Sequence, residues 1–392
     1  MHAPSPSNAA PLRIALVAPP MKSVPPVGYG GTERVIASLA EGLHARGHEV
    51  TVFATGDSHV PGRLIPIRDE CLWNSGYRGD VTAYLQIAAA RAWDHATEFD
   101  VIHSHLESHG FLFARHSPTP VVTTMHSRLD DGNAGIPELM EDFRDIPLVA
   151  ISRNQRRWWP DHNWVGTIHH GENLAGSPFG ERPGEYLAVV GRLSPEKGIA
   201  ESIELARQSK WPLKLAAKAL DPAELDMERE LVRPAVDEGV IDYLGELEPD
   251  DRDRLFAGAF ATLMLGSWPE PFGLVAIESL ATGTPVIGRR TGALPEIVEE
   301  GVDGFLVDDL GEANLALGRI ASLDRAEIRR RALRRFSVER MTEDYEEVYR
   351  RLIAGARRGA AGPTPLSSRR PAWRDRSATE PRTETTPTGT AR

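Results

Sequence analysis

The stretch ATLMLGSWPEPFGLVAIESLATGTPVI, residues 261–287, contains a complete strand–helix–strand unit. Ala261 to Leu265 is a short apolar run typical of a buried strand, and Pro285 to Ile287 is a second one. Gly273 stands between them where a helix would begin, and Glu278 would lie within that helix. The unit predicts two parallel strands of one sheet joined by a helix.

The same alternation of apolar runs and helix-like segments continues along the chain in both directions. Continuous apolar strands separated by helices predict parallel sheets that are covered on both faces. The strands expected before residue 180 are Leu12–Ala18, Glu49–Ala54, Asp100–Ser104, Pro120–Met125, Leu148–Ile151 and Val165–Ile168; those after it, besides the two above, are Tyr186–Val190, Leu213–Ala217, Ile241–Leu244 and Phe305–Val307.

Gly, Pro, Asn and Glu cluster between Gly171 and Gly184, as in a linker. A chain of 392 residues also exceeds what one hydrophobic core usually serves. The prediction is an α/β protein with two doubly wound Rossmann-like domains, residues 1–180 and 181–336, that face each other across a cleft. Ligands of such sheets bind outside the carboxyl ends of the strands.

Two further segments follow the second predicted domain. Residues 337–354 have helical periodicity with one apolar stripe, and this helix is expected to pack back on the first domain. Residues 355–392 have few apolar side chains and carry about +5, from eight arginines and three acidic residues, so a disordered basic tail is expected. The tail is either simply solvated or contacts an anionic surface or partner. The stripe consists of Met341, Tyr345, Val348, Tyr349 and Leu352.

Charge and composition limit the classes of partner. The formal net charge of −11 argues against nucleic acid. Cys71 is the only cysteine, so an intrachain disulfide and a cysteine zinc cluster are excluded, which favours the cytoplasm. No apolar run approaches the roughly 18 residues of a membrane span. Peripheral contact with the inner membrane face stays open.

Two glutamates in the opening stretch are candidates for ligand binding. Glu270 falls in the loop at the carboxyl end of a strand, and Glu278 falls one helix later and would point back to the same cleft. The amides of Phe272, Gly273 and Leu274 would be free donors at a helix N-terminus, suited to sugar hydroxyls or phosphate. The alternative is an ordinary strand–loop–helix connection.

The segment GRLSPEKG, residues 191–198, follows the predicted strand Tyr186–Val190 directly. Arg192 and Lys197 would place two cations at a strand–helix junction, where they could stabilise the negative charge of a departing diphosphate. A surface arginine and lysine without a ligand are the alternative.

The loop after the first strand and the end of the fourth complete the candidate site. Gly30 and Gly31 would let the backbone approach a ligand closely and present amides to anionic groups, although a flexible loop is the simpler explanation. His126 follows the strand Pro120–Met125 and is expected to face the cleft, unless it is structural. The histidine pairs 103/105 and 169/170 are interpreted as structural.

Several motifs that would indicate other chemistry are missing. The one D-x-D sequence, Asp251-Arg252-Asp253, is interpreted as a helix cap and solvated face, so no metal site is predicted. The sequence contains neither a G-x-x-x-x-G-K-[ST] phosphate loop nor a G-x-S-x-G nucleophile elbow.

Taken together, these segments resemble the GT-B-fold retaining glycosyltransferases of family 4, from about Arg13 to Ile353. The glutamate motif and the Gly191–Gly198 segment are the most specific parts of the resemblance. It implies that Arg192 and Lys197 clamp the diphosphate, that Glu278 holds the ribose hydroxyls, and that Glu270 holds the transferred sugar. It also implies that His126 lies near the reacting sugar.

Two segments depart from the family's pattern. His170-Gly-Glu-Asn173 stands where N-G-[IV]-D is frequent, and Gly292-Ala-Leu-Pro-Glu296 has one glycine where two are common. These changes bear on the identity of the donor more than on the reaction class.

The predicted function is that of a hexosyltransferase that moves a sugar from a nucleoside diphosphate sugar to an acceptor hydroxyl with retention, without metal or cofactor. The acceptor is a saccharide, a lipid or a small molecule. Front-face attack is favoured because no covalent nucleophile is evident, and a double displacement stays open. Rival functions are a nucleotide-sugar epimerase or a phosphorylase on the same fold, and a non-catalytic nucleotide-sugar-binding protein.

Overall fold

The computed structural model describes residues 10–28, 30–129, 136–219 and 221–359. The chain divides into two units between Ile353 and Ala354, and the first of them holds both predicted domains. The part of the predicted basic tail from residue 360 onward lies outside the described residues. None of the described helices combines the length and apolar character needed to cross a bilayer.

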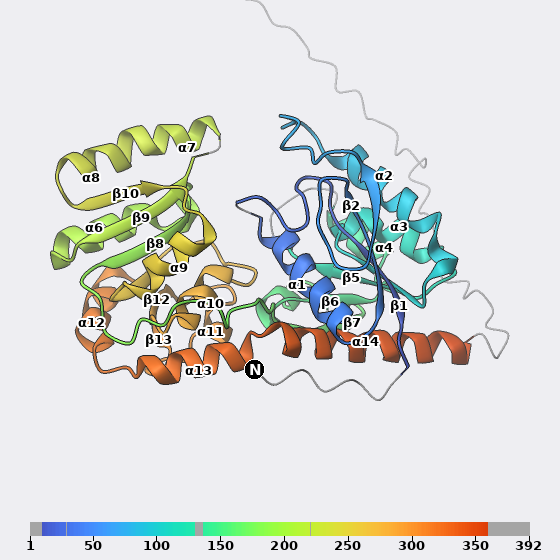
Figure 1. Ribbon diagram of the computed structural model, residues 1–392. Helices are drawn as coiled ribbons and strands as arrows, with labels where there is room; N and C mark the ends of the chain where they lie inside the picture. The colour runs from blue at the N-terminus through green and yellow to red at the C-terminus, as the bar shows by residue number, and fades with distance from the viewer. Residues whose placement is uncertain (1–9, 29, 130–135, 220, 360–392) are drawn as a thin grey trace, which may run out of the picture. The chain divides into compact units, whose positions relative to one another are not determined.

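The first half of the chain forms a seven-stranded sheet in the order β3-β2-β1-β4-β5-β6-β7, and every neighbouring pair is parallel. Helices lie between most of the strands (Figure 1). The strands are β1 Arg13–Val17, β2 Glu49–Thr55, β3 Arg63–Arg68, β4 Val101–Ser104, β5 Val121–Met125, β6 Leu148–Ala150 and β7 Trp164–Thr167; the helices are α1 Gly31–Ala45, α2 Thr82–Trp93, α3 Phe111–Arg115, α4 Ile136–Asp142 and α5 Arg153–Arg156.

The second half forms a six-stranded parallel sheet in the order β10-β9-β8-β11-β12-β13. Its strands are β8 Leu187–Arg192, β9 Leu213–Lys218, β10 Ile241–Gly245, β11 Ala261–Met264, β12 Val286–Arg289 and β13 Gly304–Val307. Its helices are α6 Ile199–Ser209, α7 Pro222–Met227, α8 Arg233–Asp237, α9 Pro249–Ala257, α10 Leu274–Ala281, α11 Leu294–Ile297, α12 Leu310–Ile320 and α13 Arg325–Arg335.

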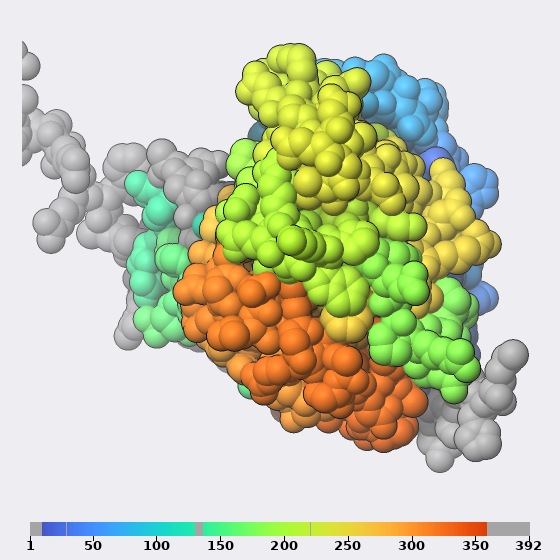
Figure 2. Space-filling model, turned by 90° about the vertical axis from the view of Figure 1, so that its left-hand side faces the viewer, coloured from blue at the N-terminus to red at the C-terminus, as the bar shows by residue number. Residues whose placement is uncertain are grey.

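Alternate residues of the second sheet pack into different cores, as expected for a sheet covered on both faces. Ile287 and Phe305 pack with helices α6, α8 and α12, whereas Val286 and Leu306 pack with α10, α11 and α13. Helices α6 and α12 lie side by side, as the green and orange surfaces of Figure 2 show. The predicted pair of doubly wound parallel sheets is confirmed.

The structure differs from the sequence-based expectation at two strands. Strand β3 was not predicted, because only Ile67 of its six residues is buried and Pro66 interrupts the run. It lies at the edge of its sheet, where proline is tolerated. Strand β8 extends two residues further than expected, since Gly191 and Arg192 continue the register with Ala217 and Lys218 of β9.

Both sheets reverse their strand order at a point that creates a crevice. The reversal lies between β1 and β4 in the first sheet and between β8 and β11 in the second. Ligands of doubly wound sheets bind at the carboxyl ends of the strands at such points. Gly30 and Glu270 lie in the loops that follow β1 and β11, and Arg192 is the last residue of β8.

The C-terminal helix α14, Val338–Gly359, follows α13 in the second half but packs on the first half (Figure 1). Its apolar stripe shares a buried cluster with Ile14 and Leu16 of β1. Two of its tyrosines also make buried hydrogen bonds beneath the sheet. The hydroxyl of Tyr349 lies 2.7 Å from His103 Nδ1, and that of Tyr345 lies 2.9 Å from Thr124 Oγ1.

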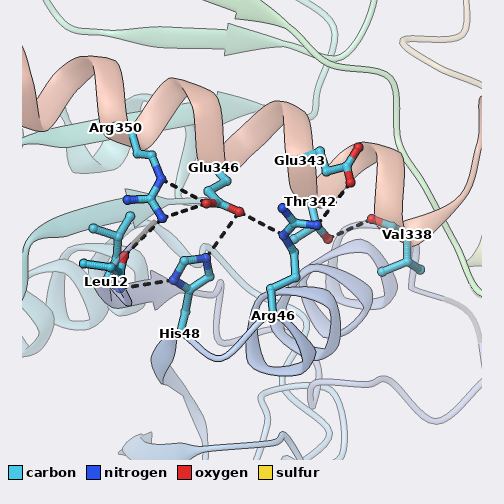
Figure 3. A network of polar contacts seen from close by, with 9 residues as sticks. Leu12, Arg46, His48, Val338, Thr342, Glu343, Glu346 and Arg350 are labelled. Carbon is cyan, nitrogen blue, oxygen red and sulfur yellow. Dashed lines mark hydrogen bonds and ion pairs between the residues drawn. The ribbon is translucent and has the colours of Figure 1, made fainter. Parts of the chain in front are cut away.

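A buried carboxylate fixes α14 to the end of α1 (Figure 3). Glu346 accepts hydrogen bonds from Arg46 Nε and Arg350 Nε, each at 2.9 Å, and His48 Nε2 lies 3.4 Å away. Burial raises the pKa of the Glu346 carboxyl, but the hydrogen bonds from Arg350 and Arg46 outweigh burial and hold the pKa at about 2. The ionised carboxylate is therefore part of the folded structure.

Replacing Glu346 with glutamine should lower the free energy of unfolding by about 3 kcal/mol at pH 7. Because the folded pKa lies below the unfolded one, this contribution is present above about pH 5 and is lost as the pH falls toward 2. Denaturant titrations across this pH range would measure it. Glu343→Gln removes a mostly exposed partner of the same Arg46 and should cost less than about 1 kcal/mol; equal losses for both variants would contradict the assignment.

Candidate active site

A pocket of about 300 Å³ opens between the carboxyl ends of the two sheets. Its walls come from the loop before α1, the end of β5, the turn after β8 and the loop between β11 and α10. Every site residue predicted from the sequence lines this pocket: Gly30, Gly31, His126, Arg192, Lys197, Glu270, Phe272, Gly273, Leu274 and Glu278.

The two predicted glutamates lie on opposite sides of the start of α10. Glu270 lies in the loop that connects β11 to α10 and forms an ion pair with Lys197. Glu278 lies within α10, and its side chain is only 3% exposed. Lys197 reaches Glu270 from a 3-10 turn over Pro195–Lys197, so the turn after β8 and the loop after β11 are joined by opposite charges.

A close backbone contact supports the loop that carries Glu270. Gly292 has a φ of +60°, and a Cβ atom there would lie 2.4 Å from the Glu270 nitrogen. The amide of Ala293 also donates to the Glu270 carbonyl at 2.9 Å. A side chain at position 292 would therefore displace Glu270, which explains the need for glycine there.

The start of α10 is where the two halves of the chain approach each other. Gly273, with a φ of +108°, precedes the helix. The Phe272 ring is buried against His170, with ring centroids 4.9 Å apart. A Cβ atom on Gly31 would lie 3.2 Å from the Leu274 side chain, so the glycine loop contacts the helix start closely.

Arg192 lies at the end of β8, and its guanidinium is held by carboxylates at the start of α7. Its Nε donates to Glu224 Oε1 at 2.7 Å, and its Nη2 lies 3.6 Å from Asp221 Oδ2. Glu224 is buried, so the orientation of Arg192 is fixed before any ligand binds. Arg192 and Lys197 together present two oriented cations to the same wall of the pocket.

A cluster of charges at the base of the pocket was missed by the sequence reasoning. Arg34, on α1, forms ion pairs with both Glu172 and Glu278, and Arg252 Nη2 lies 3.4 Å from Glu278 Oε1. Burial raises the pKa of Glu172 to about 7; Arg34 opposes the shift and Glu278 adds to it. Arg34 lies only three residues after Gly31, and this closeness to the glycine loop was the one feature of the sequence that could have indicated a place in the site.

The interpretation of Asp251-Arg252-Asp253 as a cap and solvated face is wrong for two of its residues. Asp251 is exposed in the first turn of α9, as expected. Arg252 instead lines the pocket, and Asp253 accepts a hydrogen bond from Ser177 at 2.7 Å. The side chains of Arg252 and Asp253 are 18% and 23% exposed, against 58% for Asp251, so the side of α9 that carries them is turned toward the protein. Among the described residues, no group of three His, Cys, Asp or Glu side chains could hold a metal ion.

His126 belongs to a row of neighbouring histidines at the carboxyl ends of the strands of the first sheet. Its Nε2 lies 2.9 Å from His105 Nδ1, and its ring stacks on His170 with centroids 5.4 Å apart. Burial lowers the pKa of His126 to about 3, so this histidine is neutral at pH 7. Glu107 Oε1 accepts from the amides of His126 and Ser127 and fixes this turn.

The other predicted structural histidines have partners within the fold. His103 lies 2.7 Å from both Tyr349 Oη and Thr124 Oγ1, and His169 Nε2 lies 3.1 Å from Glu296 Oε2. His170 also lines the pocket, so it has a place in the site that the sequence reasoning did not give it.

Comparison with known proteins identifies the family. A model described as Glycosyltransferase Family 4 matches residues 29–170, and one described as glycosyl transferases group 1 matches residues 179–337. The chain belongs to glycosyltransferase family 4. The predictions of the family, of the GT-B fold and of a glycosyltransferase as the enzyme class are therefore confirmed.

Named members of the family resemble the chain over most of its length. The D-inositol 3-phosphate glycosyltransferase of Mycolicibacterium smegmatis is 27% identical over 72% of this chain and 76% of its own. The phosphatidyl-myo-inositol mannosyltransferase of Mycobacterium tuberculosis is 26% identical over 88% of this chain and 98% of its own. The crystal structure of AviGT4, a glycosyltransferase involved in avilamycin A biosynthesis, has a TM-score of 0.65 and is 26% identical, covering 88% of this chain and 99% of that one.

Replacing Gly292 with alanine should lower the rate of glycosyl transfer about tenfold or more, because the Glu270 backbone would have to move. Gly301→Ala is the matched control, since Gly301 also has a positive φ, of +77°, but open space around its Cβ position. Both variants should lose roughly 1–2 kcal/mol of stability from the strained backbone. Turnover and thermal unfolding of both would check this, and equal turnover would show that Gly292 does not position Glu270.

Proposed function

We propose that this glycosyltransferase transfers a sugar from a nucleoside diphosphate sugar to an acceptor hydroxyl with retention of anomeric configuration, without a metal ion or cofactor. The observation that carries the proposal is the meeting of two cations and two glutamates in one pocket. Arg192 and Lys197 come from the segment after β8, and Glu270 and Glu278 from the segment after β11. The pocket lies where both sheets reverse their strand order.

The positions of the charges support one orientation of the donor. The diphosphate would lie between Arg192, Lys197 and the first amides of α10, where cations and helix dipole both favour negative charge. The ribose would bind Glu278 deeper in the pocket, and the transferred sugar would bind Glu270 nearer to His126. Because Lys197 is now paired with Glu270, donor binding would exchange this ion pair for contacts to phosphate and sugar.

The proposed reaction is a front-face substitution. The acceptor oxygen forms its bond to the anomeric carbon on the face from which the diphosphate departs, and the bond from that carbon to the phosphate oxygen breaks. The departing phosphate oxygen takes the proton of the acceptor hydroxyl. Arg192 and Lys197 stabilise the charge that develops on the diphosphate, the role that a metal ion has in other transferases.

His126 would take part through hydrogen bonding rather than as a cationic acid. Its pKa of about 3, caused by burial, keeps the imidazole neutral at pH 7. A neutral ring next to the transferred sugar can bind a sugar hydroxyl without competing with Arg192 and Lys197 for the diphosphate. This would confine positive charge to the side of the pocket where the leaving group forms.

The acceptor is proposed from the relatives. Those described above are named for D-inositol 3-phosphate and phosphatidyl-myo-inositol, which are polyols that present several ring hydroxyls. A cyclic polyol or saccharide hydroxyl is therefore the acceptor class that we propose for this chain. Inositol, its 3-phosphate and simple glycosides are the first compounds to assay.

Transfer assays with UDP-, GDP- and ADP-sugars on these acceptors would test the reaction directly. The product should have the anomeric configuration of the donor, as read from NMR coupling constants. Turnover should be nearly unchanged in excess EDTA, because protein cations stabilise the leaving group. An inverted product would refute retention, and a loss of activity that Mn²⁺ or Mg²⁺ restores would refute metal independence.

Replacing Arg192 or Lys197 with alanine should each lower turnover by roughly 10²–10³-fold, since each removes charge stabilisation from the transition state. Arg207→Ala is the control, because Arg207 forms a surface ion pair with Glu238 on the outside of α6. Thermal unfolding would show that the variants are folded. Wild-type turnover of both pocket variants at saturating donor would place the diphosphate elsewhere.

A further inference from the structure

Arg34 belongs to the first half of the chain but contacts the wall of the pocket that comes from the second half. It lies in the first turns of α1, three residues after Gly31. Its Nη2 is 2.5 Å from Glu278 Oε1, on helix α10, and these two residues are 244 positions apart in the sequence. The contact joins the helix that follows the glycine loop to the glutamate proposed to hold the ribose.

A second carboxylate, that of Glu172, also pairs with Arg34. Glu172, in the segment between the two sheets, forms an ion pair with the same Nη2 atom. Its side chain is 6% exposed, and its other oxygen, Oε1, is buried without a hydrogen-bond partner in the described part of the chain. Glu172 is itself fixed, because its amide donates to the Phe336 carbonyl at 3.0 Å.

Among the described residues, the ion pairs of Glu278 fall on one of its two oxygens. Arg34 Nη2 and Arg252 Nη2 both approach Oε1. Two guanidinium groups on one oxygen fix the plane of the carboxylate, as expected for charge-assisted hydrogen bonds. The second oxygen is then oriented to accept a hydrogen bond from a ribose hydroxyl of the nucleotide. A carboxylate that rotates freely would not be held in this orientation.

Burying the charged side chains of Arg34, Glu172 and Glu278 together costs free energy, and a role in binding would account for this cost. Glu172 and Glu278 are both buried carboxylates that share one arginine, and like charges at close range oppose each other. Burial is the largest cause of the raised pKa of Glu172; the charge of Glu278 raises it further, and Arg34 opposes the shift. Two apolar side chains would fill the same space at no such cost.

We propose that Arg34 is a positioning residue for the donor: it holds the Glu278 carboxylate in the orientation that accepts ribose hydroxyls, and Glu172 anchors it there. The inference rests on the proposed function, since it assumes that Glu278 binds the nucleotide. It adds that the first half of the chain contributes to nucleotide affinity through Arg34, and that α1 and α10 are held together when the nucleotide is bound.

Nucleotide affinity provides the test. UDP, GDP and ADP are titrated calorimetrically into wild-type protein, and the nucleotide that binds most tightly is used for all variants. Arg34→Gln should weaken binding roughly tenfold, the loss expected for a hydrogen bond between charged groups. Arg34→Lys should lose part of this affinity, because an ammonium keeps the charge but not the planar fork.

A double variant separates positioning from direct contact. If Arg34 acts through Glu278, then Arg34→Gln combined with Glu278→Ala should bind the nucleotide no more weakly than Glu278→Ala alone. Arg46→Gln is the matched control, since it removes an arginine that joins the other end of α1 to Glu346 of α14 (Figure 3). It should lower the melting temperature and leave nucleotide affinity unchanged.

Each outcome has a definite meaning. Wild-type affinity in Arg34→Gln, or losses that add in full in the double variant, would overturn the inference. If Arg34→Gln does not fold, the same criteria apply to Arg34→Lys and to Arg34→Gln combined with Glu172→Gln, which removes the unpaired buried charge. Wild-type protein that binds none of the three nucleotides would refute the proposed function itself, whereas binding by wild type and Arg34→Gln alike would refute only the role of Arg34.

Discussion

The structure depends on the pairing of every pocket cation with a carboxylate. The proposed diphosphate site needs positive charge in a partly buried pocket, and unpaired charges there cost several kcal/mol each. The chain meets this constraint with ion pairs between segments far apart in sequence: Lys197 with Glu270, Lys218 with Glu246, and Arg34 with Glu278. Ligand binding at such a site is an exchange of partners, so it need not uncover a bare charge at any stage.

The chain topology brings these pairs together. Parallel strands put the carboxyl ends of β8 and β11 side by side, so Lys197 and Glu270 meet although 73 residues separate them. The first half contributes Arg34 because α1 starts at the glycine loop that touches Leu274. Helix α14 then returns to the first sheet, where Tyr345 and Tyr349 are fully buried. The first half thus contributes a residue to the second, and a helix that follows the second half packs on the first.

Structural features that depend on a local stretch of residues could be predicted from the sequence, whereas those that depend on contacts between distant residues could not. Buried parallel strands are continuous apolar runs, so twelve of the thirteen strands in the described part of the chain were predicted, and the edge strand β3, which is mostly not buried, was missed. The candidate site followed from strand ends, because topology carries those to one edge. The partners of Arg34 could not be found in this way, since Glu172 and Glu278 lie 138 and 244 residues away. Arg252 was wrongly interpreted as solvated for the same reason, because the sequence of a polar helix does not show which element packs against it.

The two walls of the pocket differ in the charged side chains that they carry. Among the described residues, the wall from the second half carries four cations and four glutamates, Arg192, Lys197, Lys218, Arg252, Glu196, Glu246, Glu270 and Glu278, whereas the wall from the first half presents His126, His170 and Arg34. Burial lowers the pKa of both histidines, and His126, Arg340 and His169 lower the pKa of His170 further, so both rings are neutral at pH 7. The charge of Arg34 is shared by two glutamates. In the proposed reaction the leaving diphosphate would take over Arg192 and Lys197 from their carboxylate partners, while an acceptor hydroxyl near His126 would meet an uncharged hydrogen-bonding group. Under the proposed front-face mechanism, this arrangement would stabilise the charge on the departing phosphate without trapping the acceptor as an anion.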